Sequence, residues 1–323
     1  MVSERVVVAI STPLADELVA RVRAVDDRIE VRHEPDGAEV LLGLPDRSPG
    51  ALAEVVRANP GLSWVQVLAE DADEQVRAAG LTDRELGRVT ITSATDVHAV
   101  PLAEFAVFGI LAFTKGLPRL VADGRAHRWG HHTVAELAGS TVLVVGLGPV
   151  GVEVARLAKA FGMRVLAVNR NGRTDCPYVD EIRTARFLGD LLPVAHSVVL
   201  TLPSTEQTRG LIGSAAIGRM HSGAVVVDVS GGGVLDEAAL VQALQQGKLA
   251  GAALDVFATE PLPADSPLWD LPNVLISPHT AGRSEREDER VVDEFIENLR
   301  RYLAGTELHD TVTPTGRDGG RQR

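Results

Sequence analysis

A single cysteine, Cys176, is present among the 323 residues, aromatic side chains make up only 4% of the chain, and acidic residues outnumber basic ones. One cysteine cannot form a disulfide within the chain, so the sequence fits a reducing compartment and predicts a cytoplasmic protein. The formal net charge of −12 argues against a nucleic-acid-binding protein and against attachment to an anionic membrane surface. No run approaches the ~18 consecutive apolar residues of a membrane span. What remains is a chain of ordinary globular composition, long enough for about two domains.

The most informative stretch is a strand, a glycine-rich turn and a helix in that order. An apolar, β-branched run at Thr141–Val145 leads into a turn with three glycines and then into apolar residues at helical spacing. A second strand is predicted at Arg164–Val168. In a dinucleotide-binding unit such glycines allow a tight turn, close approach of the pyrophosphate and close packing of helix on strand. We therefore predict that a pyrophosphate binds at the N-terminus of this helix, in contact with Gly146, Leu147, Gly148, Pro149, Val150 and Gly151.

The residue at the end of the second strand indicates which dinucleotide is bound. Sites that prefer NAD usually have Asp or Glu there, about 20 residues after the glycines, to bind the ribose 2′-hydroxyl. This chain has Asn169, followed by Arg170 and Arg173. A carboxylate repels a 2′-phosphate, whereas an amide and two guanidinium groups suit it. We predict a preference for NADP(H), with NAD(H) as the second choice; the alternative that both arginines are ordinary solvated loop residues stays open.

Strands and helices alternate along the chain, which predicts parallel sheets covered by helices on both faces. In the first part we expect strands at Val6–Ile10, Val40–Leu44, Trp64–Leu68 and Val89–Thr92. A long apolar helix at about 98–115 leads into a second domain, with strands at 141–145, 164–168, 197–202, 224–229, 251–256 and 274–277. Apolar spacing within 283–301 predicts a helix that returns to the first domain. The Gly- and Arg-rich residues 314–323 are expected to form a disordered tail.

Several later stretches resemble the D-2-hydroxyacid dehydrogenase family. They are LPSTEQTRGLIG at 202–213, GGVLDEAAL at 232–240, GAALDVFATEPLP at 251–263 and NVLISPHTAG at 273–282. The resemblance implies an α/β fold of two doubly wound parallel-sheet domains. In it, a Rossmann nucleotide domain (98–283) is inserted into a discontinuous flavodoxin-like substrate domain (1–97 and 284–313). It also implies a homodimer formed through the nucleotide domain and a small-molecule substrate.

In the dehydrogenases of this family a His paired with a Glu handles the proton while the nicotinamide transfers a hydride. The resemblance places that pair at His279 and Glu260. A carboxylate beside an imidazole favours the protonated ring, which can give a proton to a carbonyl oxygen as the hydride arrives. Asp255 falls at a family position near the nicotinamide amide. Further cofactor contacts implied by the resemblance are Leu202, Pro203, Thr208, Val229, Ser230, His279 and Gly282.

Two departures from the family pattern concern the substrate. The family has an Arg that holds the substrate's carboxylate and carbonyl, but this chain has Gly231 there, and neither Arg nor Lys lies between Arg219 and Lys248. The family's small residues after the Trp-Val-Gln strand are replaced by acids, among them Glu70 and Asp71. Losing a charge-assisted hydrogen bond costs about 1.5–3 kcal/mol, and one like charge ~6 Å away adds about 3 kcal/mol at an effective dielectric constant of ~20. Both changes disfavour a 2-keto acid.

The sequence therefore predicts an NADPH-dependent oxidoreductase that reduces a carbonyl or an imine and whose substrate is not a simple 2-keto acid. Glu70 and Asp71 are candidates to pair with an amine on that substrate, or are merely a solvated loop. If the rest of the site is intact, Gly231→Arg should raise activity on glyoxylate or hydroxypyruvate.

Two alternatives stay open. One is a conventional 2-hydroxyacid dehydrogenase of the glyoxylate or hydroxypyruvate reductase type, with a guanidinium group from Arg283, Arg128 or Arg77. The other is a nucleotide-binding regulatory protein without catalysis. No metal site is predicted, because the adjacent His131 and His132 point in different directions and have no third ligand nearby.

Overall fold

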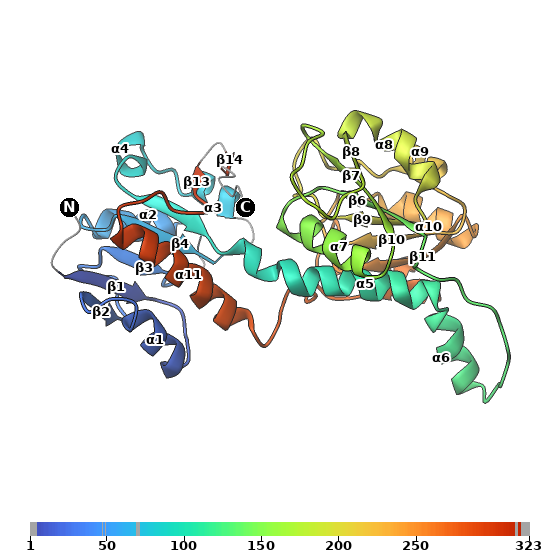
Figure 1. Ribbon diagram of the computed structural model, residues 1–323, viewed down its shortest axis with the longest axis horizontal. Coiled ribbons are helices and arrows are strands. Elements are labelled where there is room, and N and C mark those ends of the chain that lie inside the picture. The colour runs from blue at the N-terminus through green and yellow to red at the C-terminus, as the bar shows by residue number, and fades with distance from the viewer. Residues whose placement is uncertain (1–4, 47, 49, 69–71, 314–315, 318–323) are drawn as a thin grey trace. The chain divides into compact units, whose positions relative to one another are not determined.

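The computed structural model describes residues 5–46, 48, 50–68, 72–313 and 316–317. The chain forms two compact units, the first from Met1–Val97 with Glu285–Arg323 and the second from His98–Ser284. The second unit is thus inserted into the first along the sequence, and the ribbon can be followed out of the first unit and back into it (Figure 1).

The first unit is built on a five-stranded parallel sheet. Its strands, in spatial order, are β2 (Ile29–Arg32), β1 (Val6–Ile10), β3 (Val40–Leu42), β4 (Trp64–Val67) and β5 (Thr90–Ser93). This order, 2-1-3-4-5, is that of flavodoxin-like folds.

Helices cover both faces of this sheet and enclose separate apolar cores. On one face lie α1 (Asp16–Arg23) and α11 (Glu287–Leu303), where Trp64 stacks on Phe295 with ring centroids 4.8 Å apart. On the other lie α2 (Ala51–Ala58) and α3 (Ala72–Ala78), with α4 (Asp83–Leu86) before β5. The sequence prediction that the last long helix packs on the first domain is confirmed by the contacts of α11.

The second unit is built on a seven-stranded parallel sheet. In spatial order its strands are β12 (Val274–Ile276), β11 (Leu249–Leu254), β10 (Ala224–Asp228), β9 (Ser197–Leu200), β6 (Thr141–Val145), β7 (Arg164–Asn169) and β8 (Glu181–Thr184). Counted within the unit from β8, this is the Rossmann order 3-2-1-4-5-6 with a seventh strand added. The predicted fold class, two parallel-sheet α/β domains, is confirmed.

Alternate side chains of the central strands face two cores, because successive residues of a strand point to opposite faces. Val142 and Val144 contribute to the core beneath α5 (Ala99–Thr114) and α7 (Pro149–Ala160). Leu143 and Val145 contribute to the other core, beneath α8 (Leu188–Leu191), α9 (Ser214–Arg219) and α10 (Glu237–Gln245). The helix α6 (Leu117–Arg125) buries none of its residues.

One helical stretch of the described chain, Asp96–Thr114, is long and apolar enough to cross a membrane by length and composition. Half of its apolar window is buried within the protein, where α5 packs against α7, β10 and β11. A buried core helix meets the same criteria, so the stretch is weak support for a membrane span.

Several short strands differ from the sequence prediction. The sequence predicts neither β2 nor β8, which read IEVR and EIRT and lie at the edges of their sheets. Edge strands carry charged side chains that lower their apolar signal. The sequence also predicts disorder from residue 314, whereas β14 (Gly316–Arg317) pairs antiparallel with β13 (Val312–Thr313). Backbone hydrogen bonds form that ladder, so apolar side chains are not required.

Candidate active site

The predicted cofactor residues follow the carboxyl ends of the strands in the second unit. Gly146 comes after β6, Asn169 ends β7, and Leu202, Val229 and Asp255 follow β9, β10 and β11. The loop after β12 carries the predicted proton donor. Because all the strands are parallel, these positions lie together along the edge of the sheet formed by the carboxyl ends of its strands. The strand order reverses between β6 and β9, and in such sheets ligands bind at the edge beside the reversal.

The three glycines of the turn between β6 and α7 have different structural roles. Gly146 has φ +103°, a backbone conformation that L side chains rarely adopt. A Cβ on Gly151 would lie 2.2 Å from the Gly146 carbonyl oxygen, so helix and turn pack too closely for a side chain. A Cβ on Gly148 would meet no atom within 4 Å, and α7 begins there without a side-chain cap or an acid in its first turn. The start of α7 is an open, positively polarised surface that fits a diphosphate.

Asn169 organises the loop that carries the two predicted arginines. The Gly172 N–H donates to Asn169 Oδ1 at 2.6 Å, and Asn169 Nδ2 donates to the Arg173 carbonyl at 2.8 Å. The amide therefore acts first on the loop backbone, a role that the sequence does not indicate. Arg170 and Arg173 are exposed, and neither forms an ion pair with a described residue. Two uncompensated guanidinium groups thus lie where β7 ends.

Two further arginines lie at the end of the neighbouring strand. In the β7–β8 pair, Thr184 is opposite Asn169. The guanidinium carbons of Arg183 and Arg186 lie 5.7 and 4.6 Å from the centroid of the Phe187 ring. Arg183 pairs with a glutamate of its own strand, whereas Arg186 has no carboxylate partner among the described residues. Sequence reasoning missed Arg186 because it did not predict the strand before it.

The loop after β9 is closed by Thr208 and tied to the glycine turn by Thr201. The Thr208 hydroxyl donates to the Pro203 carbonyl at 2.6 Å and accepts the Thr205 N–H at 2.8 Å. Thr201 Oγ1 donates to the Gly146 carbonyl at 2.7 Å. The sequence analysis missed Thr201, whose one signal is a hydroxyl at the end of an apolar strand.

Gly231 packs directly against this loop. Its N–H donates to the Leu202 carbonyl at 3.0 Å, and a Cβ on Gly231 would lie 2.6 Å from the Ser204 backbone nitrogen. Real Cβ atoms essentially never approach so closely, so any side chain at 231 requires a backbone shift. The sequence expectation that Gly231→Arg simply restores an arginine therefore meets a steric obstacle that the sequence does not show.

A single carboxylate oxygen holds the loop that carries His279. Asp255 is buried, and its Oδ1 accepts hydrogen bonds from the Ser277 hydroxyl at 2.5 Å and from the N–H groups of Thr280 and Ala281 at 2.9 and 3.0 Å. Within this loop His279 has φ +54°, a left-handed conformation that costs a non-glycine residue about 1–3 kcal/mol. Such strain persists where the surroundings enforce it and gathers at functional sites.

His279 and Glu260 are brought together as the resemblance implies. The His279 Nδ1–H donates to Glu260 Oε2 at 2.7 Å, and Glu260 Oε1 accepts the Phe257 N–H at 2.9 Å. Each glutamate oxygen thus has a defined partner. Beyond the histidine, the Gly282 carbonyl accepts a 3.3 Å hydrogen bond from Nδ1 of the buried His98, at the start of α5. The pair can hold a proton on the imidazole and deliver it from the other ring nitrogen, Nε2.

Asp228 is a buried carboxyl beneath this edge that the sequence analysis did not select. It is only 2% exposed, and its Oδ1 accepts the Ser230 N–H at 3.0 Å. Burial raises the pKa of Asp228 to about 6; the hydrogen bonds from Ser230 oppose this shift, and the charges of Glu237 and Asp255 add to it. Removing the carboxyl's charge while keeping its shape should therefore favour the folded state.

Asp228→Asn is expected to stabilise the protein at neutral pH. Because the pKa of Asp228 is raised from 3.8 to about 6 on folding, this group lowers the free energy of unfolding as pH rises from about 4 to about 6, and the loss persists above that range. The loss amounts to about 3 kcal/mol. Asparagine keeps the acceptor for the Ser230 N–H, so the thermal midpoint should rise at pH 7.5 and change little near pH 4. Equal gains at both pH values would contradict this.

Several predictions fall outside this site. Glu70 and Asp71 lie outside the described residues. No three His, Cys, Asp or Glu side chains of the described chain gather as metal ligands would.

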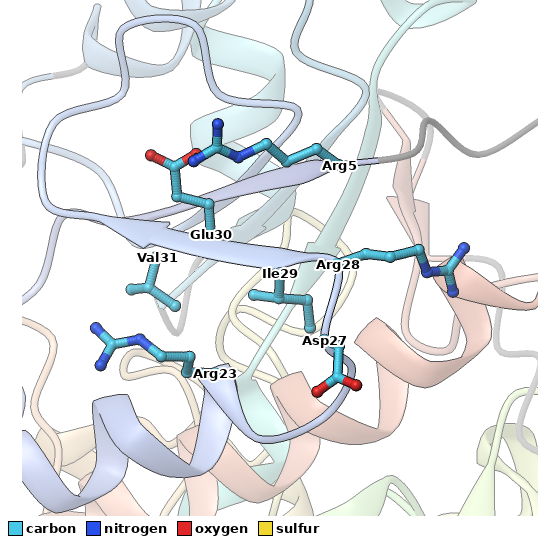
Figure 2. Close-up of a pocket in the computed structure, with 7 residues that line it drawn as sticks. All are labelled: Arg5, Arg23, Asp27, Arg28, Ile29, Glu30 and Val31. Carbon is cyan, nitrogen blue, oxygen red and sulfur yellow. The ribbon is translucent and has the colours of Figure 1, made fainter.

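A cavity of about 440 Å³ lies beside the edge strand β2 of the first unit, where Arg5 reaches toward Glu30 (Figure 2). Arg28, on its rim, pairs with Asp26 at 2.8 Å. These charges offset one another, and no predicted site residue lines the cavity.

The family model for the D-isomer specific 2-hydroxyacid dehydrogenase, NAD binding domain, matches residues 107–281. That range is more than half of the chain and contains the glycine turn, Asp255, Glu260 and His279. The chain belongs to the D-isomer specific 2-hydroxyacid dehydrogenase family. The resemblance drawn from the sequence motifs is thereby confirmed.

Relatives of this family member are named as dehydrogenases and reductases. D-3-phosphoglycerate dehydrogenase of Mycobacterium tuberculosis is 35% identical, over 96% of this chain and 59% of its own length. Glyoxylate reductase of Korarchaeum cryptofilum is also 35% identical, over 78% of this chain and 76% of its own length. The chain thus spans 59% of the length of the mycobacterial relatives that it matches.

Solved structures share the fold over nearly the whole chain. A D-isomer specific 2-hydroxyacid dehydrogenase from Xanthobacter autotrophicus Py2, in complex with NADPH and MES, has a TM-score of 0.80 and 27% identity. The match covers 97% of this chain and 99% of that one. A nicotinamide dinucleotide site is thus a property of the family and of a structural neighbour.

Proposed function

We propose that this family member is a cytoplasmic, NADPH-dependent oxidoreductase that reduces a carbonyl or an imine with no carboxylate beside the reacting carbon. The proposed substrate class rests on the close approach of Ser204 to Gly231. Backbone fills the space beside residue 231, where the family resemblance places the arginine that holds a substrate carboxylate. With no guanidinium group there, a 2-keto acid loses its main charge-assisted hydrogen bonds.

The residues at the sheet edge fit NADPH. The open start of α7, at Gly148, would hold the diphosphate. Arg170 and Arg173 would hold the 2′-phosphate, since both are exposed and have no described carboxylate partner. The neighbour from Xanthobacter autotrophicus Py2 is itself a complex with NADPH. NAD(H) is the weaker alternative because no carboxylate stands at position 169 to bind a ribose 2′-hydroxyl.

The chain's own residues supply the proton and orient the group that donates it. A bound nicotinamide cofactor supplies the hydride. His279 donates a proton from Nε2 to the carbonyl oxygen or imine nitrogen, while its Nδ1–H remains hydrogen-bonded to Glu260. Glu260 also stabilises the positive charge of the ring before the transfer. Asp255 fixes the loop so that the ring starts from one orientation.

A conventional 2-hydroxyacid dehydrogenase is the second candidate, and Arg283 favours it. This arginine lies in the same loop as His279, is exposed, and has no carboxylate partner in the described chain. Its N–H closes a turn onto the Thr280 carbonyl at 3.0 Å. Of the other guanidinium groups considered, Arg128 is already paired with Asp123 at 2.7 Å. The glyoxylate reductase of Korarchaeum cryptofilum is a relative of this second type by name.

Glyoxylate and its methyl ester, which differ in charge and by one methyl group, separate the candidates. We expect kcat/KM with NADPH to be at least about tenfold higher for methyl glyoxylate than for glyoxylate, because only the acid needs a cationic partner. A preference for glyoxylate that Arg283→Ala abolishes would establish the conventional dehydrogenase instead. NADPH binding without turnover of any carbonyl or imine would support the regulatory alternative.

Gly231→Arg is expected to destabilise the protein and to bring no gain on glyoxylate. The smaller change Gly231→Ala already places a Cβ 2.6 Å from the Ser204 nitrogen and should lower the free energy of unfolding by about 1–3 kcal/mol. Gly61→Ala is the matched control, because a Cβ there would lie 3.9 Å from its nearest neighbour, the Ala38 carbonyl oxygen, which is ordinary van der Waals contact. Denaturant unfolding and glyoxylate assays measure both effects. A stable, glyoxylate-active Gly231→Arg variant would overturn the steric account.

We also propose a homodimer formed through α6 and the segment 126–136 of the second unit. Large apolar side chains are exposed here, with Trp129 94% exposed and Leu120 49% exposed. In Figure 1 α6 and the segment after it extend beyond the body of this unit. Apolar groups that a monomer leaves in water mark interaction surfaces. The segment is held to the unit by Lys115, whose Nζ donates to the Ala135 carbonyl at 2.8 Å.

Trp129→Glu is expected to weaken this dimer. Truncating or charging a buried interfacial Trp typically costs about 2 kcal/mol or more, so the dissociation constant should rise by about 30-fold or more. Sedimentation equilibrium measures it. Trp269→Glu is the control, since Trp269 is likewise an exposed tryptophan, at 50%, but lies in the short helix Pro267–Asp270 before β12. Equal effects of both variants, or none, would exclude this surface as the interface.

A further inference from the structure

We infer that Glu237, the first residue of α10, is a positioning residue for the proton-donor pair His279 and Glu260. The inference rests on the proposed function, because it assigns Glu237 a role in orienting that pair. Nothing in the sequence beyond its place in the 232–240 stretch singles this glutamate out. Its contacts in the folded unit do.

Two glutamates from different elements hold consecutive backbone N–H groups of one loop. The Ala258 N–H donates to Glu237 Oε1 at 2.6 Å, and the Phe257 N–H donates to Glu260 Oε1 at 2.9 Å. The Oε1 contact of Glu260 lies within its own loop and cannot fix that loop relative to the rest of the unit. The contact of Glu237 joins the loop to α10, whose Leu240 is fully buried.

The position of Glu237 makes this contact strong. Asp236 caps α10 by accepting the Ala239 N–H at 3.0 Å, so Glu237 stands in the first turn, where the helix dipole stabilises a negative charge. A backbone N–H bound to a carboxylate is among the stronger hydrogen bonds in proteins. The loop also packs on the glycine run, since a Cβ on Gly232 would lie 2.8 Å from the Phe257 carbonyl oxygen.

The contact of Glu237 with the loop affects His279 through Glu260. Glu260 Oε2 accepts the Nδ1–H of His279 at 2.7 Å, so a shift of the 257–260 loop changes the tautomer and direction of the imidazole. Asp255 holds the histidine's own loop, and the buried Asp228 accepts the Ser230 N–H. Neither contacts the 257–260 loop through a described side-chain hydrogen bond. Glu237 is thus the described side chain outside the loop that anchors the loop bearing Glu260.

Two conservative variants separate the contact of Glu237 from its charge. Glu237→Asp keeps the charge at the helix start but is one methylene too short to reach the Ala258 N–H. Glu237→Gln loses the charge and keeps an oxygen acceptor at the same reach. We expect Glu237→Asp to lower kcat about tenfold with little change in KM, the loss of one charge-assisted hydrogen bond, and Glu237→Gln to stay within about twofold of wild type. Asp190→Ala, which removes an exposed carboxylate of the same unit, controls for net charge.

A spectroscopic measurement tests the inference without turnover. In ¹⁵N-labelled protein at a pH where the ring is neutral, two-bond correlations report the tautomer of His279, assigned with His279→Gln. We expect the Nδ1–H tautomer in wild type and Glu237→Gln, and a mixture with Nε2–H in Glu237→Asp. An unchanged His279 spectrum and kcat in Glu237→Asp, with its thermal midpoint unchanged, would overturn the inference. If wild type turns over no carbonyl or imine, the proposed function fails, while the tautomer still decides whether Glu237 positions the pair.

Discussion

His279→Ala is expected to lower kcat by about 10²- to 10⁴-fold, the usual range for removal of a general acid. Without the imidazole, water must supply the proton to the developing alkoxide or amide anion, and water is both weaker and unoriented. The side chain lies at the sheet edge in a loop fixed by three hydrogen bonds to Asp255 Oδ1, so its removal should leave the fold intact. NADPH affinity is expected to stay within about threefold of wild type, because the imidazole acts mainly in the transition state.

The control for this prediction is Glu260→Gln. It keeps the length of the side chain and one oxygen, which can accept the Phe257 N–H or the His279 Nδ1–H but not both, and it removes the negative charge that stabilises a protonated ring. Its loss in kcat should fall between those of wild type and His279→Ala. Steady-state and single-turnover kinetics with NADPH measure both variants. Full activity in His279→Ala would exclude this histidine as the proton donor and leave the regulatory alternative in its place.

The double variant Arg170→Ala, Arg173→Ala is expected to raise the dissociation constant for NADPH by about 100-fold or more. Each guanidinium group is expected to give the 2′-phosphate charge-assisted hydrogen bonds worth about 1.5–3 kcal/mol. NADH lacks that phosphate, so its affinity should change by less than about threefold. Calorimetric titration of both nucleotides gives the ratio directly.

Two further variants sharpen this cofactor prediction. Arg164→Ala is a matched control, because Arg164 begins the same strand at the opposite edge of the sheet and pairs with Glu181 at 2.9 Å. Asn169→Asp keeps the acceptor for the Gly172 N–H but replaces the Nδ2 donor to the Arg173 carbonyl with a carboxylate oxygen, and it should shift preference toward NADH. Equal losses for NADPH and NADH in the double variant would show that the arginines act on the fold and not on the 2′-phosphate.

The buried central strands were predictable from the sequence. The strands at the edges of the sheets were not. Val142–Val145 forms a continuous apolar run, because both faces of this central strand are covered. The edge strands β2 and β8 alternate apolar with charged residues, as in Ile29–Arg32, and an isolated alternation of that length resembles a loop. Because β8 was not predicted, Arg186, which follows the strand paired with the end of β7, was not selected as a site residue.

The site residues that lie in long sequence motifs were predictable. The residues that hold them in place were not. The motifs place His279 and Glu260, and the fold brings their side chains within 2.7 Å. No sequence pattern shows that Thr201 holds the glycine turn or that Glu237 holds the 257–260 loop, because each depends on one hydrogen bond between distant segments. The steric block at Gly231 is hidden for the same reason, since it comes from a loop 27 residues earlier, at Ser204.

The most direct test of the reductase proposal is a pair of titrations of the unmodified protein, with NADPH and with NADH at identical ionic strength. If Arg170 and Arg173 bind a 2′-phosphate, NADPH binds at least about tenfold more tightly than NADH, and screening of carbonyls and imines proceeds with NADPH. If neither nucleotide binds, the glycine turn is only a structural element, and hydride transfer by this chain is contradicted at its first step.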